Sequence, residues 1–210
     1  MKLTTYFRST AAYRVRIALN LKEVKYELNP LNLFTGEQRS SNFIKVNPDG
    51  LLPVLETNEG ILTQSMSILE YLEETQTAVK LLPDDPIQRA FIRALAQTIV
   101  SDIHPLNNLR VQKYLSTEMG VDDDNKLKWY QHWVATGFKA LEKRLADSAD
   151  QYCVGNTVSL ADICLIPQVY NANRFNCPMN DYPTINRLNQ ECLKLDAFAR
   201  AAPDLQPDAL

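Results

Sequence analysis

Residues 47–74 read NPDGLLPVLETNEGILTQSMSILEYLEE, a stretch that holds two turns, two short apolar runs and the beginning of a helix. Each turn, at residues 47–50 and 58–60, contains a glycine that can adopt positive φ. The apolar runs at residues 52–55 and 61–62 follow these turns and predict a β-hairpin. Ile68, Leu69 and Leu72 are spaced as on one face of a helix, so we expect a helix after the hairpin.

Pro53 and the pair Gln64-Ser65 are the residues of this stretch that suggest a binding site. Proline cannot donate to a sheet ladder, so we expect Pro53 at the start of an edge strand, with the backbone of Leu52 free to pair with an extended peptide. Unpaired N–H groups at a helix start, together with the Ser65 hydroxyl, would suit a carboxylate. A β-hairpin followed by an ordinary capped helix is the alternative interpretation of the same residues.

This pattern resembles the glutathione-binding half of the thioredoxin-like domain in glutathione S-transferases. The resemblance implies that the backbone of Leu52 pairs with the cysteinyl part of glutathione and that Gln64 and Ser65 hold the γ-glutamyl carboxylate. It also implies a cis Leu52–Pro53 bond, a strong prediction because about 5–6% of X–Pro bonds in folded proteins are cis. We therefore predict Leu52, Pro53, Gln64 and Ser65 as glutathione-binding residues.

Composition limits the other possible functions. The chain has 210 residues, of which 45% are hydrophobic, and a net charge of −3, which argues against nucleic-acid binding. No apolar run is long enough to span a membrane, and the first residues do not read as a signal peptide. With two histidines and no CxxC pair among four cysteines, we predict no metal site and free buried thiols in a cytoplasmic protein.

The order of predicted elements gives two domains. Up to residue 79 the pattern reads β-α-β-α-β-β-α, which fits a mixed sheet with helices on its faces. Residues 80–86 contain two prolines and two acids and read as a linker. From there the pattern is helical. We therefore predict an α/β domain at residues 1–79, thioredoxin-like by the resemblance, and an all-α helical bundle at residues 86–210, with a loosely ordered tail from Pro203.

A second local signal lies in the helical half. Ser159-Leu160-Ala161-Asp162 is a capping box that predicts the start of a central helix, and we assign Ser159 and Asp162 to folding rather than to chemistry. Pro105 lies inside a long helical segment, which it should kink or end because it removes a hydrogen bond.

Ser9 and Thr10 are the candidate catalytic residues. They lie between the first predicted strand and the first predicted helix, where unpaired N–H groups and hydroxyls would stabilise a thiolate. The alternative is an ordinary helix N-cap.

Residues 8–19, RSTAAYRVRIAL, are similar to the zeta class of glutathione S-transferases, in which a Ser-Ser-Cys motif precedes an Arg-Val-Arg-Ile-Ala-Leu helix. Ser9 matches the first serine of the motif and Thr10 the second, but Ala11 replaces the cysteine. Further similarity extends over nearly the whole chain, through residues 152–155, 160–162, 167–169, 173–175 and 182–184.

The class implies a glutathione-dependent cis–trans isomerase that converts maleylacetoacetate to fumarylacetoacetate in the breakdown of aromatic amino acids or aromatic acids. By resemblance, Arg8 and Arg174 bind the dicarboxylate substrate. Residues 104–110 look like the maleylpyruvate isomerases of the class, in which His104 and Asn108 would reach glutathione and Arg110 would line the substrate pocket. For Arg110, a solvated helix charge is the alternative.

Several functions remain open on the sequence. The substrate is maleylacetoacetate or maleylpyruvate. A general glutathione-conjugating or dehalogenating enzyme of the same class is a second hypothesis, and a non-catalytic glutathione-fold binding protein is a third, which the missing cysteine at Ala11 favours slightly. The family also implies a homodimer. The charge and the short apolar runs predict no nucleic-acid partner and no membrane association.

Overall fold

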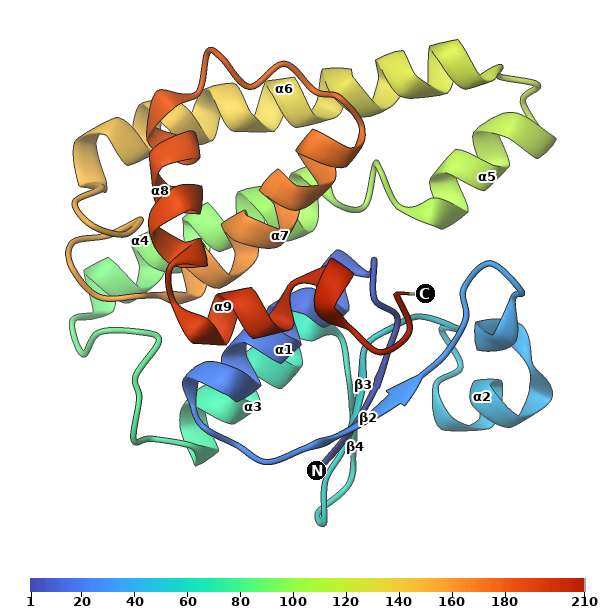
Figure 1. Ribbon diagram of the computed structural model, residues 1–210, viewed down its shortest axis with the longest axis horizontal. Coiled ribbons are helices and arrows are strands. Elements are labelled where there is room, and N and C mark those ends of the chain that lie inside the picture. The colour runs from blue at the N-terminus through green and yellow to red at the C-terminus, as the bar shows by residue number, and fades with distance from the viewer. Residues whose placement is uncertain (210) are drawn as a thin grey trace. The chain divides into compact units, whose positions relative to one another are not determined.

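The computed structural model describes residues 1–209, which form two compact units (Figure 1). The first unit holds Met1–Lys80 together with the chain from Leu193 on, and the second holds Leu81–Cys192. The sequence predicted an α/β domain followed by an all-α domain, and both classes are confirmed.

A mixed sheet forms the centre of the first unit. Its strands are β1 (Lys2–Thr5), β2 (Glu27–Pro30), β3 (Val54–Glu56) and β4 (Ile61–Thr63), in the order β2-β1-β3-β4. β1 runs parallel to β2 and antiparallel to β3, and the register pairs Leu3 with Leu55, both fully buried. β3 and β4 form the predicted hairpin, closed by a hydrogen bond from Thr57 N–H to Gly60 O at 2.9 Å.

The position of β3 corrects one expectation. β3 pairs with β1 on one side and β4 on the other, so it is a central strand rather than an edge strand. Pro53 is tolerated because it lies one residue before Val54, where the ladder begins, and its missing N–H is therefore not needed for pairing.

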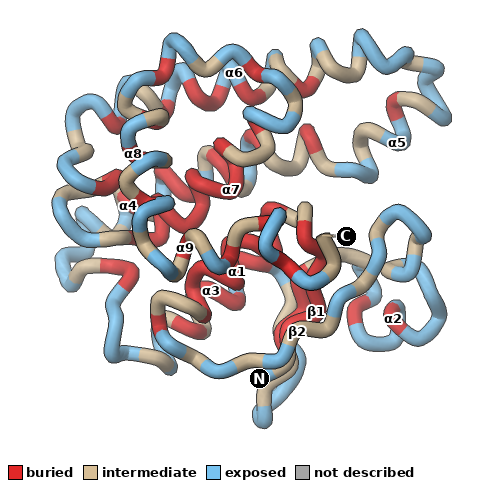
Figure 2. Tube along the Cα trace, viewed as in Figure 1, coloured by how far each residue is buried: buried red, intermediate tan, exposed pale blue. Residues whose placement is uncertain are grey.

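Within residues 1–80, the helices of the first unit are α1 (Thr10–Leu21), η1 (Glu37–Arg39), α2 (Ser41–Val46) and α3 (Ser65–Thr75). α1 and α3 pack side by side, and α3 buries Ile68, Leu69 and Leu72 as their spacing predicted. α1 is buried over nearly its whole length, from Thr10 to Leu19 (Figure 2). The buried set includes two arginines, Arg14 and Arg16, which the hydrophobic pattern did not indicate.

The C-terminal segment belongs to the first unit, not to the helical domain in which the limits 86–210 placed it. α9 (Asp196–Ala201) packs against α1, and Phe198 is fully buried (Figure 1). The segment continues as the short helix η3 (Pro203–Leu205), after which the buried Gln206 donates hydrogen bonds to the carbonyls of Arg200 and Ala202. The expectation of a loosely ordered tail was therefore wrong. The contacts that hold the segment to the first unit, between α9 and α1 and between Asp208 and Phe7, join distant parts of the chain and leave no local sequence signal.

The second unit is helical throughout its elements, which are α4 (Pro86–Gln97), η2 (Thr98–Ile103), α5 (Leu109–Thr117), α6 (Asp123–Ser148), α7 (Leu160–Arg174) and α8 (Pro183–Leu193). As predicted, the segment that contains Pro105 ends there, just after η2. Among the helices described for residues 1–209, none has the length and apolar character needed to cross a membrane.

The start of α7 is the predicted capping box. The backbone N–H and the hydroxyl of Ser159 both donate to Asp162 Oδ2 at 2.8 Å, and Cys153 N–H donates to Asp162 Oδ1 at 2.8 Å. Burial raises the pKa of the Asp162 carboxyl, and these hydrogen bonds oppose the shift. Asp162 is fully buried, so its role is structural, as the sequence indicated.

η2 is a π-helix that continues α4, and its last backbone bond runs from His104 N–H to Ile99 O at 2.9 Å. It packs against α6 where Gly137 lies. A Cβ atom at Gly137 would overlap Cγ1 and Cδ1 of Ile103, the buried last residue of η2. Glycine at position 137 therefore allows η2 to approach α6 closely. This approach fixes the position of the end of η2, directly before His104.

We predict that Gly137→Ala destabilises the protein by about 1–3 kcal/mol, because overpacking at Ile103 outweighs the gain in helix propensity of about 0.5–1 kcal/mol. Denaturant unfolding measures this change. Gly60→Ala is the matched control, because Gly60 has open space around it, and its stability should stay near the parent value. In the Ile103→Ala background, where the overlapping side chain is gone, Gly137→Ala should cost less stability than in the parent. An equal cost of Gly137→Ala in both backgrounds would contradict the proposed overlap.

Candidate functional site

The turn between β1 and α1 carries the candidate catalytic residues. Ser9 is the N-cap of α1, and its Oγ accepts a hydrogen bond from Ala12 N–H at 3.2 Å. Because that bond uses the oxygen as acceptor, the hydroxyl proton remains available for a ligand. Ser9 is half-buried, while Thr10, the next residue, is 2% exposed. The geometry therefore favours Ser9 over Thr10 as the residue that a ligand can touch.

Leu52 and Pro53 lie directly before β3. Their peptide bond is cis, which confirms the prediction. Leu52 is half-buried and Pro53 is buried, so Leu52 is the more accessible of the two residues.

Gln64 and Ser65 lie where β4 passes into α3. Gln64 is exposed and has φ of 66° and ψ of 119°, a left-handed conformation that a residue with a side chain rarely adopts. Such strain persists where the surroundings hold it, and it is typical of ligand sites. Ser65 is the first residue of α3, is 5% exposed, and accepts a hydrogen bond from Arg14 Nη1 at 3.3 Å.

Arg14 and Arg16 support this region, and the sequence analysis assigned them no role. Arg14 is fully buried and connects α1 to Ser65 at the start of α3. Arg16 is also fully buried, and its guanidinium donates to Thr5 Oγ1, Phe7 O and Ala201 O, each at 3.0 Å. The sequence did offer a signal for this role, since Arg14 and Arg16 stand among apolar residues of α1. A buried charged side chain almost always has a partner, so such arginines point to specific contacts.

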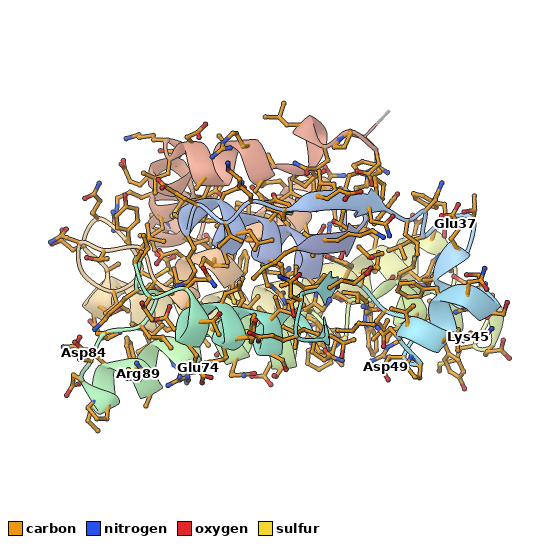
Figure 3. The ribbon with its side chains drawn as sticks, turned by 90° about the horizontal axis from the view of Figure 1, so that it is seen from below. Glu37, Lys45, Asp49, Glu74, Asp84 and Arg89 are labelled. Carbon is orange, nitrogen blue, oxygen red and sulfur yellow. The ribbon has the colours of Figure 1, made fainter. Side chains whose placement is uncertain are left out.

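A cavity of about 500 Å³ opens beside this turn in the first unit. Arg8 lines it together with residues from the ends of β1 and β2 and from the C-terminal segment, among them Phe7, Asn32 and Asp208. The Arg8 guanidinium lies over the Phe7 ring, 4.7 Å from its centroid. Glu37, labelled in Figure 3, closes the loop after β2 by accepting from Asn32 N–H at 2.8 Å.

In the second unit, His104, Asn108 and Arg110 share one loop and the helix that follows it. Asn108 is the N-cap of α5, and its Oδ1 accepts from Arg110 N–H at 3.0 Å. α6 anchors this loop, because Trp129 Nε1 donates to Leu106 O at 2.9 Å and Asn107 Nδ2 donates to Tyr130 O at 3.3 Å. The Arg110 side chain is exposed and therefore accessible.

Arg174 is the last residue of α7 and is exposed. Its guanidinium lies over the Phe175 ring at 4.8 Å, and that ring stacks on Tyr130 with centroids 3.8 Å apart. Since Asn107 is bonded to the Tyr130 carbonyl, one chain of contacts joins Arg174 to the loop that carries His104. This series of contacts therefore links Arg174 to the segment that carries the other three predicted residues, His104, Asn108 and Arg110.

The protein's own thiols are poor candidates for a nucleophile. All four cysteines are free and buried, as predicted. Burial raises the pKa of Cys177 to about 11 and that of Cys153 well above its usual range. Because a raised pKa disfavours the thiolate, Cys153 and Cys177 are poor nucleophiles at neutral pH. Within residues 1–209, His, Cys, Asp and Glu side chains do not gather in groups that could hold a metal ion.

Comparison with known families identifies the class. The model of the glutathione S-transferase N-terminal domain matches residues 1–74, and the model of the glutathione S-transferase C-terminal domain matches residues 124–196. The chain therefore belongs to the glutathione S-transferase family.

Its relatives place it more closely, in the zeta class. A probable maleylacetoacetate isomerase of Vibrio cholerae is 50% identical over 206 residues, 97% of this chain and 96% of that protein. The holo structure of a maleylpyruvate isomerase, described as a bacterial glutathione S-transferase of the zeta class, has a TM-score of 0.98, 42% identity and coverage of 100% of both chains. A maleylacetoacetate isomerase from Methylobacterium extorquens AM1, solved with malonate and glutathione bound, has a TM-score of 0.97, 44% identity and coverage of 100% of both chains.

Proposed function

We propose that this protein is a glutathione-dependent cis–trans isomerase that converts maleylacetoacetate to fumarylacetoacetate, with maleylpyruvate as the alternative substrate. The observation that carries the proposal is Ser9, a half-buried hydroxyl with a free proton at the start of α1, in a chain similar over its full length to isomerases of maleyl acids. When bound, glutathione supplies the thiolate whose reversible addition to the cis double bond allows rotation about it.

The first unit holds glutathione in this proposal. Ser9 donates a hydrogen bond from its hydroxyl to the thiolate and keeps its proton, and the unpaired N–H groups at the start of α1 favour the same negative charge. Leu52 offers its backbone to the cysteinyl part, next to Pro53. Gln64 and Ser65 hold the γ-glutamyl carboxylate, and the fully buried Arg14 adds positive charge behind Ser65.

The second unit contributes the remaining binding residues. We assign His104 and Asn108 to glutathione and assign Arg110 and Arg174 to the dicarboxylate substrate, together with Arg8 of the first unit. An arginine fork matches a carboxylate in both shape and charge. The Phe175 ring under Arg174 and the Phe7 ring under Arg8 limit the orientations of both guanidinium groups before the substrate arrives.

The test is turnover of maleylacetoacetate and maleylpyruvate, followed by absorbance with and without glutathione. We expect isomerisation of at least one substrate that depends on glutathione. Turnover of a halogenated acid without isomerisation would favour the conjugating or dehalogenating enzyme instead. Glutathione binding without any turnover would identify a non-catalytic binding protein.

Arg174→Ala is expected to raise the Michaelis constant for the maleyl substrate about ten- to a hundredfold, because a lost charge-assisted hydrogen bond costs about 1.5–3 kcal/mol. The Michaelis constant for glutathione should stay nearly unchanged. Steady-state kinetics with each substrate varied in turn measure both constants. Arg187→Ala, which removes an exposed arginine of α8, is the matched control. Loss of glutathione binding with an unaffected dicarboxylate would place Arg174 on the cofactor instead.

We further propose that the enzyme works as a cytoplasmic homodimer in the breakdown of aromatic amino acids or aromatic acids. Family resemblance supports these assignments. Light scattering coupled to size-exclusion chromatography tests the dimer directly.

A further inference from the structure

We propose that Asp208, near the end of the chain, is a positioning residue. By holding Phe7, it sets the orientation of the substrate-binding side chain of Arg8. This inference rests on the proposed function insofar as Arg8 binds the substrate carboxylate. It assigns a task in the active site to the C-terminal segment, which the sequence placed in the other domain.

Hydrogen bonds hold the backbone of Phe7 from both sides. Phe7 N–H donates to Asp208 Oδ2 at 2.8 Å. Its carbonyl accepts from Arg16 Nη2 at 3.0 Å. A hydrogen bond to a charged group is stronger than one between neutral groups, and both of these bonds involve a charged side chain. The peptide groups on either side of Phe7 are therefore fixed relative to α1 and to the C-terminal segment.

The Phe7 ring connects this backbone to the Arg8 side chain. Phe7 is 8% exposed, and its ring makes an edge contact with Tyr6, with centroids 4.7 Å apart. The Arg8 guanidinium lies over this ring, 4.7 Å from its centroid. A long arginine side chain has many rotamers, and a cation–π contact selects those that keep the group over the ring. Because Phe7 is fixed, the contact with its ring restricts the position of the Arg8 guanidinium.

The C-terminal segment is itself well anchored, because Arg16 Nε donates to Ala201 O at 3.0 Å and Gln206 Nε2 donates to Arg200 O and Ala202 O, each at 2.9 Å. Asp208 follows this anchor by two residues and lines the same cavity as Arg8. Arg16 thus contacts both the Phe7 carbonyl and the segment that carries Asp208.

The experiment separates positioning from plain stability. Asp208→Ala should raise the Michaelis constant for the maleyl substrate about three- to tenfold, less than loss of a contacting arginine, because Asp208 acts on the substrate only through Arg8. The glutathione constant should not move. Asp208→Asn keeps an acceptor for Phe7 N–H and should restore most of the loss. Asp204→Ala removes an exposed acid of the same segment and should have no effect.

A double-variant cycle with Arg8→Ala gives the decisive readout. If Asp208 acts through Arg8, then Asp208→Ala adds no further loss once Arg8 is absent. An equal loss in both backgrounds, or equal weakening of glutathione and substrate, would overturn the proposal. Phe7→Leu, which removes the ring but keeps the peptide, should reproduce the effect of Asp208→Ala.

Calorimetric titration of malonate into the glutathione-saturated protein keeps this test independent of turnover. We expect Asp208→Ala to weaken malonate binding by a similar factor, again with no additional loss in the Arg8→Ala background. If this coupling is present but neither maleyl substrate is turned over, the proposed function fails while the positioning role stands. If the enzyme isomerises but the coupling is missing, the positioning role fails alone.

Discussion

Ser9→Ala is expected to lower kcat/KM for isomerisation by roughly a hundredfold or more, the usual effect of removing one preorganised donor to a developing or stabilised anion. The Ser9 oxygen accepts a hydrogen bond from Ala12 N–H, so the Ser9 O–H can donate a hydrogen bond to the glutathione thiolate. Without that donor, the pKa of the bound thiol should rise toward that of free glutathione. The ultraviolet absorbance of the thiolate, titrated against pH in the parent and the variant, measures this shift directly.

The same substitution also removes a helix cap, worth about 1 kcal/mol, so a control must separate the two effects. Ser9→Asp keeps a capping acceptor for α1 but has no proton to donate at neutral pH and adds a repelling charge. It should therefore stay folded and be inactive. If Ser9→Asp were as active as the parent, capping alone would explain the role of Ser9.

Thr10→Ala gives the complementary comparison. Thr10 is 2% exposed, so its loss should cost less activity than the loss of Ser9. If Thr10→Ala abolishes turnover and Ser9→Ala does not, the assignment between the two hydroxyls is reversed. If both variants keep full activity, neither hydroxyl activates glutathione and the start of α1 must suffice.

Asp162→Ala is expected to cause the largest loss of stability, about 3–5 kcal/mol, because it leaves buried donors without an acceptor. The Asp162 carboxylate accepts from Cys153 N–H and from both the N–H and the hydroxyl of Ser159. No water can reach these groups easily, since Asp162 is fully buried. Urea unfolding, monitored by circular dichroism, measures the change in free energy of unfolding.

Asp122→Ala is the matched control for this prediction. Asp122 is the N-cap of α6 and accepts from Asn125 N–H at 2.8 Å, but it is exposed, so water can replace the lost bond. Its removal should cost much less than removal of Asp162. If Asp162→Ala lowers the free energy of unfolding no more than Asp122→Ala does, burial does not determine how much this capping box contributes to stability. Folded Asp162→Ala protein should retain its specific activity, because the residue serves the fold.

The features that the sequence predicted well are those that depend on neighbouring residues. The β3–β4 hairpin follows from its turns and apolar runs, and the caps at Ser9 and Ser159 follow from hydroxyls placed directly before apolar helical faces. Each involves contacts within a few residues, so local chemistry is enough to define it. The resemblance to the zeta class rests on such short segments, and the family match confirms it.

The features that the sequence did not predict depend on contacts between distant segments. The edge-strand expectation for Pro53 failed because strand order is set by how β1 inserts beside β3, which no local pattern encodes. The C-terminal segment was assigned to the wrong unit because the bonds that hold it, to Arg16 and Phe7, cross about two hundred positions of sequence.

By itself, then, the sequence determined most of the elements before residue 193, where α1 and α7 begin, and which family the chain belongs to, because periodicity, caps and motifs are local properties. Only the tertiary structure decided how those elements are used. It showed Ser9 accessible and Thr10 buried, placed Arg14 behind Ser65, and set Asp208 against Phe7. The physical reason is that burial and long-range hydrogen bonds depend on the positions of side chains in space, and these exist only once the chain has folded.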